Sequence, residues 1–162
     1  MISIKSRALA LIALIASLMA VCGPGLCTVV VNEVELNPPD ESAMWVELYN
    51  TGDQAVNLTG WTVSIRDEPW VGNIPLDGAI DPKGFRVFEG QTSWVSSQNG
   101  TVFLIDSSGK TVNKTPRLED TKDNDFTNQR IIDGRNTDTI ADWAWLRSTK
   151  GGPNSGGIKV GA

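Results

Sequence analysis

The chain has 162 residues, of which 14 are basic and 19 acidic, and it contains no histidine. This length suits one domain with a sizeable core. The missing histidine excludes Ser–His and Cys–His nucleophiles and histidine-based zinc sites. The net charge of −5 argues against nucleic acid as a partner, because acidic surfaces repel phosphates.

The first 27 residues have the pattern of a cleavable secretory signal. Lys5 and Arg7 precede an uncharged apolar run over residues 8–21, and a Gly/Pro break follows at 23–25. The run is shorter than the roughly 20 apolar residues that span a bilayer. We therefore predict a signal peptide over 1–27 and a secreted or cell-surface protein. Without Lys5 and Arg7, residues 28–162 carry 12 basic and 19 acidic residues, a net charge of −7.

Both cysteines of the chain lie in this segment. Cys22 and Cys27 follow Val21 and Leu26, whereas a lipidated cysteine usually follows a small residue. A lipid anchor therefore stays open but is not favoured. Removal of residues 1–27 takes away both cysteines, and the exported domain then has no disulfide.

Alternation of apolar and polar residues predicts the first strands. Residues 28–36 form one strand, which the prolines of 37–40 end. Its alternation places four side chains on one face: Val30, Asn32, Val34 and Leu36. Residues 44–50 form a second strand, and a tight turn at 50–53 leads into a short return strand that carries Val56 and Leu58.

The later strands follow the same pattern and are predicted at 61–66, 84–89, 101–105, 110–113, 129–132 and 142–146. We expect Phe85 and Val87 to point inward, and we expect 101–105 to be a central strand buried on both faces. The stretches between these strands, 67–82, 92–99 and 115–128, are predicted as loops. The strands of 44–67 can bury a face only against a second sheet, which indicates an all-β sandwich preceded by a signal helix. The Gly-rich end, 155–162, is predicted to be a flexible tail.

Several short motifs, in this order, resemble the lamin-tail domain, an immunoglobulin-like β-sandwich. They are Asn32–Val34, Trp45–Asn50, Val56–Leu58 with Gly60-Trp61, the 99–109 hairpin, Gln129-Arg130 with Asp133-Gly134, Trp143 and Pro153-Asn154. The resemblance covers about residues 29–154 and implies a non-catalytic module, over 28–154, that binds or scaffolds. It assigns a structural role to nine residues: Glu33, Trp45, Glu47, Asn50, Gly60, Trp61, Arg130, Trp143 and Asn154.

Two carboxylates on neighbouring predicted strands raise the question of catalysis. Glu33 and Glu47 could approach each other across a sheet, as the paired acids of a glycan hydrolase do. Alternatively, each accepts hydrogen bonds from nearby loops and holds the sandwich together. We favour this structural role over a catalytic one.

The densest acidic cluster suggests a weak calcium site. Asp120, Asp123 and Asp125 are oxygen ligands of the type that calcium prefers. Their spacing lacks the D-x-[DN]-x-[DN]-G pattern, so a solvated loop is the favoured interpretation. We expect no other cofactor.

The six tryptophans divide into two groups. Four lie in strand patterns and are predicted to be core: Trp45, Trp61, Trp143 and Trp145. Trp70 and Trp94 lie in predicted loops, where an aromatic ring can stack on a sugar or anchor a protein. The alternative, which we favour, is that they cap an open end of the sandwich.

Three triplets match the N-glycosylation sequon and begin at Asn57, Asn99 and Asn113. Asn57 is expected to point outward from a short strand. Asn99 and Asn113 are expected near turns that would accommodate a glycan.

These observations together predict an exported, non-catalytic binding or structural module. Its ligand would be a protein or a surface glycan, contacted by loops at one end of the sandwich. A carboxylate-based extracellular glycan hydrolase and a nucleic-acid-associated module are the alternatives. Contact with a membrane is expected only through the signal peptide or a lipid anchor, and the sequence does not specify an oligomeric state.

Overall fold

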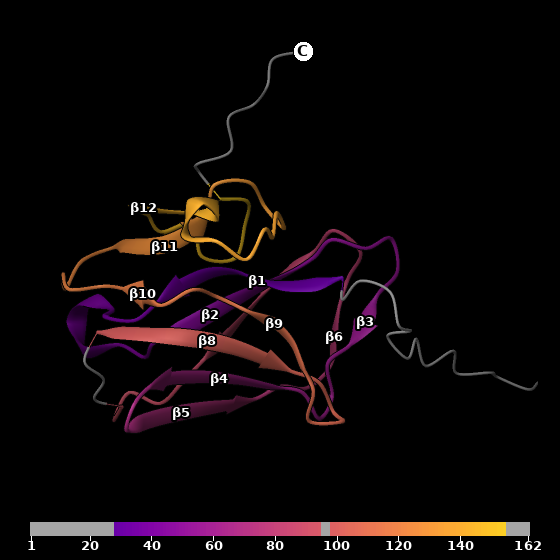
Figure 1. Ribbon diagram of the computed structural model, residues 1–162, viewed down its shortest axis with the longest axis horizontal. Helices are drawn as coiled ribbons and strands as arrows, with labels where there is room; N and C mark the ends of the chain where they lie inside the picture. The colour runs from indigo at the N-terminus through magenta and orange to yellow at the C-terminus, as the bar shows by residue number, and fades with distance from the viewer. Residues whose placement is uncertain (1–27, 95–97, 155–162) are drawn as a thin grey trace, which may run out of the picture.

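The computed structural model describes residues 28–94 and 98–154 (Figure 1). The predicted signal peptide and C-terminal tail lie outside these residues. The described chain is built from strands and two short 3-10 helices, η1 (Pro39–Glu41) and η2 (Ile140–Asp142). None of its helices is long and apolar enough to cross a membrane.

The first sheet has five antiparallel strands in the order β12-β11-β1-β2-β7. These strands are β12 (Trp143–Arg147), β11 (Phe126–Arg130), β1 (Val29–Glu35), β2 (Trp45–Asn50) and β7 (Phe85–Glu89). The two N-terminal strands are therefore central, and the C-terminal hairpin β11–β12 extends the sheet on the side of β1.

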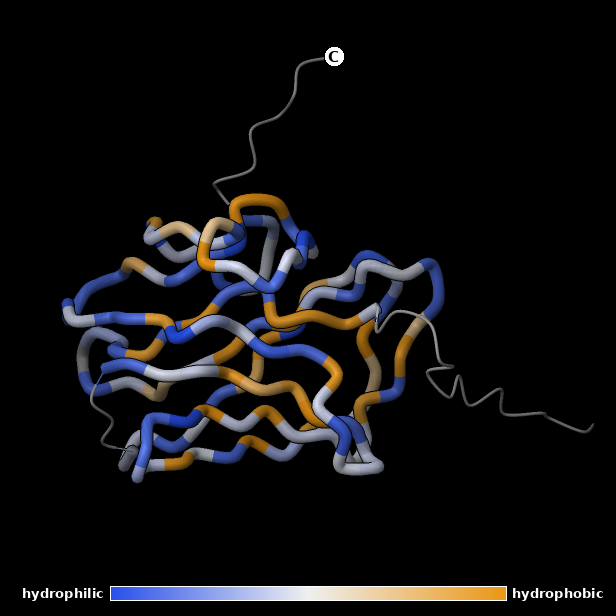
Figure 2. Tube along the Cα trace, viewed as in Figure 1, coloured by the Kyte–Doolittle hydropathy of each residue, from blue (hydrophilic) through white to orange (hydrophobic). Residues whose placement is uncertain are grey.

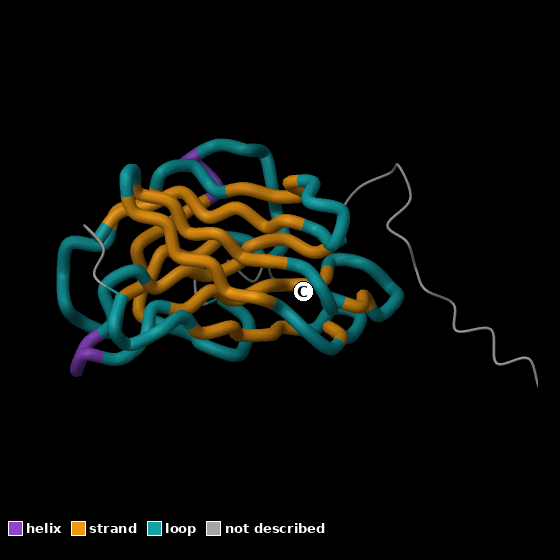
Figure 3. The backbone as a smooth tube through the Cα atoms, turned by 90° about the horizontal axis from the view of Figure 1, so that it is seen from below, coloured by secondary structure: helices purple, strands orange, loops and turns teal. Residues whose placement is uncertain are grey.

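The second sheet has the order β10-β8-β4-β5, and β9 pairs with β8. Its strands are β4 (Thr62–Asp67), β5 (Trp70–Pro75), β8 (Asn99–Ile105), β9 (Thr111–Lys114) and β10 (Leu118–Glu119). A separate pair, β3 (Val56–Asn57) and β6 (Ala79–Ile80), completes the fold. Figure 1 shows β8, β4 and β5 below β1 and β2, and Figure 3 shows the strands of both layers running along the long axis. The predicted all-β sandwich is confirmed.

The core lies between the two sheets. Figure 2 shows apolar and polar positions alternating along β4 and β5, as one buried face requires. The first sheet contributes Val29, Val31, Val34, Val46 and Leu48, and the second contributes Val63, Ile65, Val102 and Leu104. Leu36, just after β1, and Trp61, just before β4, also belong to the core. All are fully or nearly fully buried. The predicted inward face of Trp61, Val63 and Ile65 is confirmed.

The predicted face of β1 is wrong because the strand contains a β-bulge. Its pairing with β2 shifts between Val31 and Glu33, so that Asn32 is an extra residue. One extra residue exchanges the two faces of a strand beyond it. As a result Val29, Val31, Val34 and Leu36 face the core, whereas simple alternation had placed Val30 and Asn32 there.

Two predicted loops contain strands. β5 lies within 67–82 and pairs with β4, and β10 lies within 115–128 and pairs with β8. β11 also begins in that second loop, at Phe126. The short strand at Val56 pairs with β6 and not with β2, so the predicted return strand after β2 is wrong.

Two strands, β7 and β8, differ from the prediction in which of their faces is buried. In β7, Phe88 lies opposite the core residue Val46 and packs against the core, whereas Phe85 lies opposite Tyr49 and stacks on it. Directly opposite residues share a face of a sheet. β8 is buried on one face only, since Phe103 is half-buried beneath the Arg66 guanidinium.

Candidate functional site

The bulge in β1 leaves backbone groups that the strand ladder does not use, and side chains from distant segments bind them. The Val31 N–H donates to Asn113 Oδ1 at 3.0 Å, and Arg130 Nε donates to the Val31 carbonyl at 2.6 Å. Asn154 Nδ2 donates to the carbonyls of Asn32 and Arg130 at 3.1 and 2.8 Å. Buried backbone groups require such partners. We call the side chains around this bulge the bulge cluster: Asn32, Glu33, Glu47, Asn113, Arg130 and Asn154.

Glu33 and Glu47 lie directly opposite each other on β1 and β2, as predicted, and both are fully buried. Glu33 accepts hydrogen bonds from Thr127 Oγ1 at 2.6 Å and Gln129 Nε2 at 3.2 Å. It also accepts from the backbone N–H of Thr149 at 2.9 Å and from its hydroxyl at 2.8 Å. Glu33 therefore ties the segment after β12 to the first sheet.

Glu47 binds the same segment two residues further along the chain, at Gly151. It accepts hydrogen bonds from the Gly151 N–H at 2.7 Å and from Asn32 Nδ2 at 3.3 Å. Burial raises its pKa to about 7, against the lowering effect of these two bonds, and the charges of Glu33 and Asp133 add to the rise. A substrate would reach either carboxylate only by displacing residues 149–151. The two glutamates therefore have the geometry of structural residues that hold the 149–151 segment on the first sheet.

Arg130 is the largest fully buried side chain of the described residues. Besides the Val31 carbonyl it binds the Arg135 carbonyl and Asn136 Oδ1, and it lies over the Trp143 ring at 4.7 Å. Its guanidinium is 3.5 Å from the buried carboxylate of Asp142. Burial lowers the pKa of Arg130 to about 10, while Asp142 opposes this shift. Arg130 thereby holds the 131–142 loop against the sheet.

The other motif residues also have structural positions. Asn50 is fully buried and donates to the carbonyls of Gln54 and Asp81 at 2.7 and 3.1 Å. Gly60 has φ +82, which favours glycine. Trp45, Trp61 and Trp143 are buried, as predicted, but Trp145 is only half-buried.

The three predicted calcium ligands do not converge. Asp120 is buried and its carboxylate faces Glu35, and burial raises the pKa of both groups. Asp125 pairs with Arg147 at 2.9 Å, and Asp123 is exposed. Over residues 28–94 and 98–154 no three acidic or cysteine side chains are placed to hold a metal ion. The predicted cluster is not a preformed metal site.

Trp70 and Trp94 pack edge to face, with ring centroids 5.4 Å apart, and both pack against the core. Gly72 makes room for them, because a Cβ there would lie 2.6 Å from Trp70 and 2.7 Å from Trp94. This is the capping arrangement that we favoured. Trp94 and Met44 also line a cavity of about 330 Å³.

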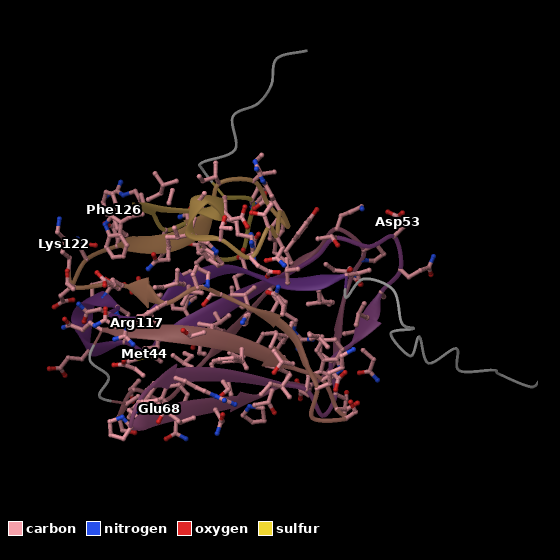
Figure 4. The ribbon with its side chains drawn as sticks, in the orientation of Figure 1. Met44, Asp53, Glu68, Arg117, Lys122 and Phe126 are labelled. Carbon is pink, nitrogen blue, oxygen red and sulfur yellow. The ribbon has the colours of Figure 1, made fainter. Side chains whose placement is uncertain are left out.

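A second cavity, of about 250 Å³, is lined by Glu119, Thr121, Lys122, Asn128 and Trp145. Figure 4 shows Lys122 and Met44 at the same end of the molecule and Asp53 at the opposite end. Gln98 lines the first cavity, and its carbonyl accepts a hydrogen bond at 2.7 Å from the N–H of Asp120, which lies in the chain between Glu119 and Thr121 of the second cavity. We call this the cavity end. Asn128 is not among the predicted site residues, and Trp145 was predicted to be core. Nothing in the sequence places Trp145 beside Phe126, because the two residues lie on different strands of the β11–β12 hairpin.

The sequons differ in exposure. Asn57 is exposed on β3, as predicted, and Asn99 is half-buried. Asn113 is only 7% exposed and its side chain binds Val31. The expectation that a glycan fits at Asn113 is therefore wrong.

An antiparallel two-sheet sandwich whose N-terminal strands are bound by buried polar side chains defines an immunoglobulin-like structural domain. A family model of the lamin tail domain matches residues 25–152. The chain belongs to the lamin tail domain family.

Other comparisons add less. No protein of curated function matches the sequence. The archaellum periplasmic stator protein FlaG from Sulfolobus acidocaldarius is similar in structure, with 12% identity and a TM-score of 0.42, over 56% of this chain and 97% of that one. A chain of the FlaF–FlaG complex from the same organism gives 11% identity and a TM-score of 0.41, over 73% of this chain and 100% of that one. Likeness at this level carries no conclusion about function.

Proposed function

We propose that the protein is an exported, non-catalytic binding or structural module that contacts a protein or a surface glycan through its cavity end. The observation that carries this proposal is that the polar side chains of the family motif are buried and form hydrogen bonds within the domain. Glu33 and Glu47 are fully buried and bound to the 149–151 segment, so the polar residues of the family motif hold the fold together. We therefore expect the binding residues to lie on surface loops that the rigid sandwich positions.

The cavity end is the best candidate for that surface. It carries two adjacent cavities, each lined by a half-buried tryptophan and several polar side chains. Binding sites are commonly concave, with an aromatic wall and a few polar groups. Aromatic side chains also supply much of the binding energy at protein interfaces.

Capture of partners from the native host tests this proposal. The tagged full chain is expressed in its host, and bound molecules from envelope and medium fractions are identified by mass spectrometry. Lys122→Glu reverses an exposed charge at the cavity end, and Lys83→Glu reverses one that pairs with Asp53 at the opposite end. We expect Lys122→Glu to lose the partner and Lys83→Glu to retain it.

The opposite results are also informative. A partner lost equally from both variants, or from neither, would place binding elsewhere. Release of shortened glycans by the wild-type chain, abolished in Glu33→Gln, would support the hydrolase alternative instead.

A further inference from the structure

We propose that the smaller cavity, defined by Trp145, Asn128 and Lys122, is a binding site for a single sugar ring. This inference rests on the proposed function, since it names a ligand class for the cavity end. The cavity lies where the edges of the two sheets meet, between β12 and β11 of the first and β10 of the second. Figure 4 shows Lys122, which lines the cavity, and Phe126, which stacks on the lining residue Trp145, at this end of the molecule.

An aromatic platform forms one wall of this cavity. Trp145 is half-buried and its ring stacks on Phe126, with centroids 6.3 Å apart and planes 24° apart. Phe126 is itself 36% exposed. Two stacked rings at an exposed edge present an apolar face beside polar groups, and the C–H face of a pyranose fits such a surface.

A hydrogen-bond acceptor with a fixed orientation lines the same space. Asn128 is 7% exposed, and its Nδ2 donates to the Glu119 carbonyl at 3.0 Å, which fixes the orientation of the amide. Its Oδ1 has no hydrogen-bond partner among the described residues, although the side chain lines the cavity. This oxygen is open to the cavity and is not one of the fully enclosed unpaired atoms of the described residues. A hydroxyl donor entering the cavity would therefore replace water on an acceptor whose orientation is already fixed.

The size and charge of the cavity narrow the ligand class. Its volume of about 250 Å³ lies below the 300–1,000 Å³ that is typical for drug-sized ligands, so one ring fits better than a longer molecule. Lys122 and Thr121 on the rim add donors, and Glu119 balances the charge of Lys122. A nearly neutral, partly aromatic and small cavity favours a neutral sugar over a nucleotide or a peptide.

Nuclear magnetic resonance titration tests the proposal. The ¹⁵N-labelled chain is titrated with methyl glycosides of glucose, galactose and mannose and with N-acetylglucosamine. We expect at least one sugar to shift the Trp145 indole and Asn128 amide signals, with a dissociation constant on the order of 1 mM. Trp145→Ala should weaken binding by at least about tenfold, because the stacking surface is removed.

Two further variants keep the test independent of folding. Lys122→Ala changes an exposed rim residue and should weaken binding several-fold with an unchanged melting temperature. Val71→Ala changes a residue that is 45% exposed on β5, the far edge of the second sheet, and should bind like the wild type. Shifts with none of the four sugars, or shifts that persist in Trp145→Ala, would overturn the sugar site. If Lys122→Glu still loses a captured partner in that case, the proposed function stands and only the ligand class is wrong.

Discussion

Glu47 lies opposite Glu33 across the β1–β2 pair, and both carboxylates bind the segment that follows β12. Both buried carboxylates thus accept hydrogen bonds from backbone N–H groups of this segment, those of Thr149 and Gly151. Burial raises the pKa of Glu47, which makes the stability of the domain depend on pH.

We expect the domain to lose stability as the pH rises from about 4.5 to about 7. Burial raises the pKa of Glu47 from 4.5 to about 7, so in this range the folded state binds more protons than the unfolded state. The contribution is complete below pH 4.5 and is lost as the pH passes through 7. Each pKa unit corresponds to about 1.4 kcal/mol, which gives a loss of about 3 kcal/mol.

Urea unfolding at several pH values measures this effect. Glu35 and Asp120 also have raised pKa values and act with the same sign, so the wild-type curve includes them. Glu47→Gln isolates the contribution of Glu47, since it should flatten the curve between pH 4.5 and 7. An unchanged slope in Glu47→Gln would show that Glu47 ionises normally in the fold.

Asn113→Ala should destabilise the domain by about 1–3 kcal/mol, because it leaves the buried Val31 N–H without an acceptor. Asn57→Ala is a matched control on an exposed sequon and should change the free energy of unfolding by less than about 0.5 kcal/mol. Glycopeptide mapping of protein from a glycosylating host should find Asn113 bare. A glycan on Asn113 of folded protein would contradict its position in the bulge cluster.

Arg130→Lys should lower the free energy of unfolding by about 3–5 kcal/mol. A lysine cannot reproduce the forked set of bonds to Val31, Asn136 and the 131–142 loop, and it leaves Asp142 poorly paired. Arg135→Lys is the control, since Arg135 is exposed and 3.5 Å from the same Asp142. Equal melting temperatures for the two variants would rule out the buried role of Arg130.

Gly72→Ala should destabilise the domain and change its tryptophan fluorescence. The added Cβ would lie within 2.7 Å of both Trp70 and Trp94, and the rings must move. Overpacking of this kind typically costs about 1–3 kcal/mol. Gly152→Ala, where the nearest atom is 3.8 Å away, should be nearly neutral. Identical emission spectra for Gly72→Ala and the wild type would show that the two rings are not packed over this position.

The sequence predicts much of this fold because most strands alternate around a single buried face. Val63 and Ile65 in β4 follow that rule. In β8 the apolar residues on both faces predict burial on both, whereas only the face of Val102 and Leu104 is buried. It fails at Asn32, where the bulge exchanges the faces of β1, because a bulge depends on partners that lie far along the chain. β5 was missed because Gly72 and Pro75 weaken its strand pattern.

The candidate site was only partly predictable. The pairing of Glu33 with Glu47 follows from neighbouring strands, but their cover comes from residues 149–151, more than a hundred positions away. Lys122, Asn128 and Trp145 meet only because the edges of two sheets meet. The hydrophobic periodicity of a single segment does not indicate which distant segments it will contact.

The central claim is that Glu33 holds the fold together and does no chemistry, and one variant tests it most directly. Glu33→Gln removes a carboxylate that accepts four hydrogen bonds. Partner capture, glycan turnover and urea unfolding are measured on this variant and the wild type at a temperature where both are folded. We predict a loss of about 2–3 kcal/mol of stability with capture unchanged and no turnover in either protein. Unchanged stability, together with a turnover that only the wild type shows, would contradict the account.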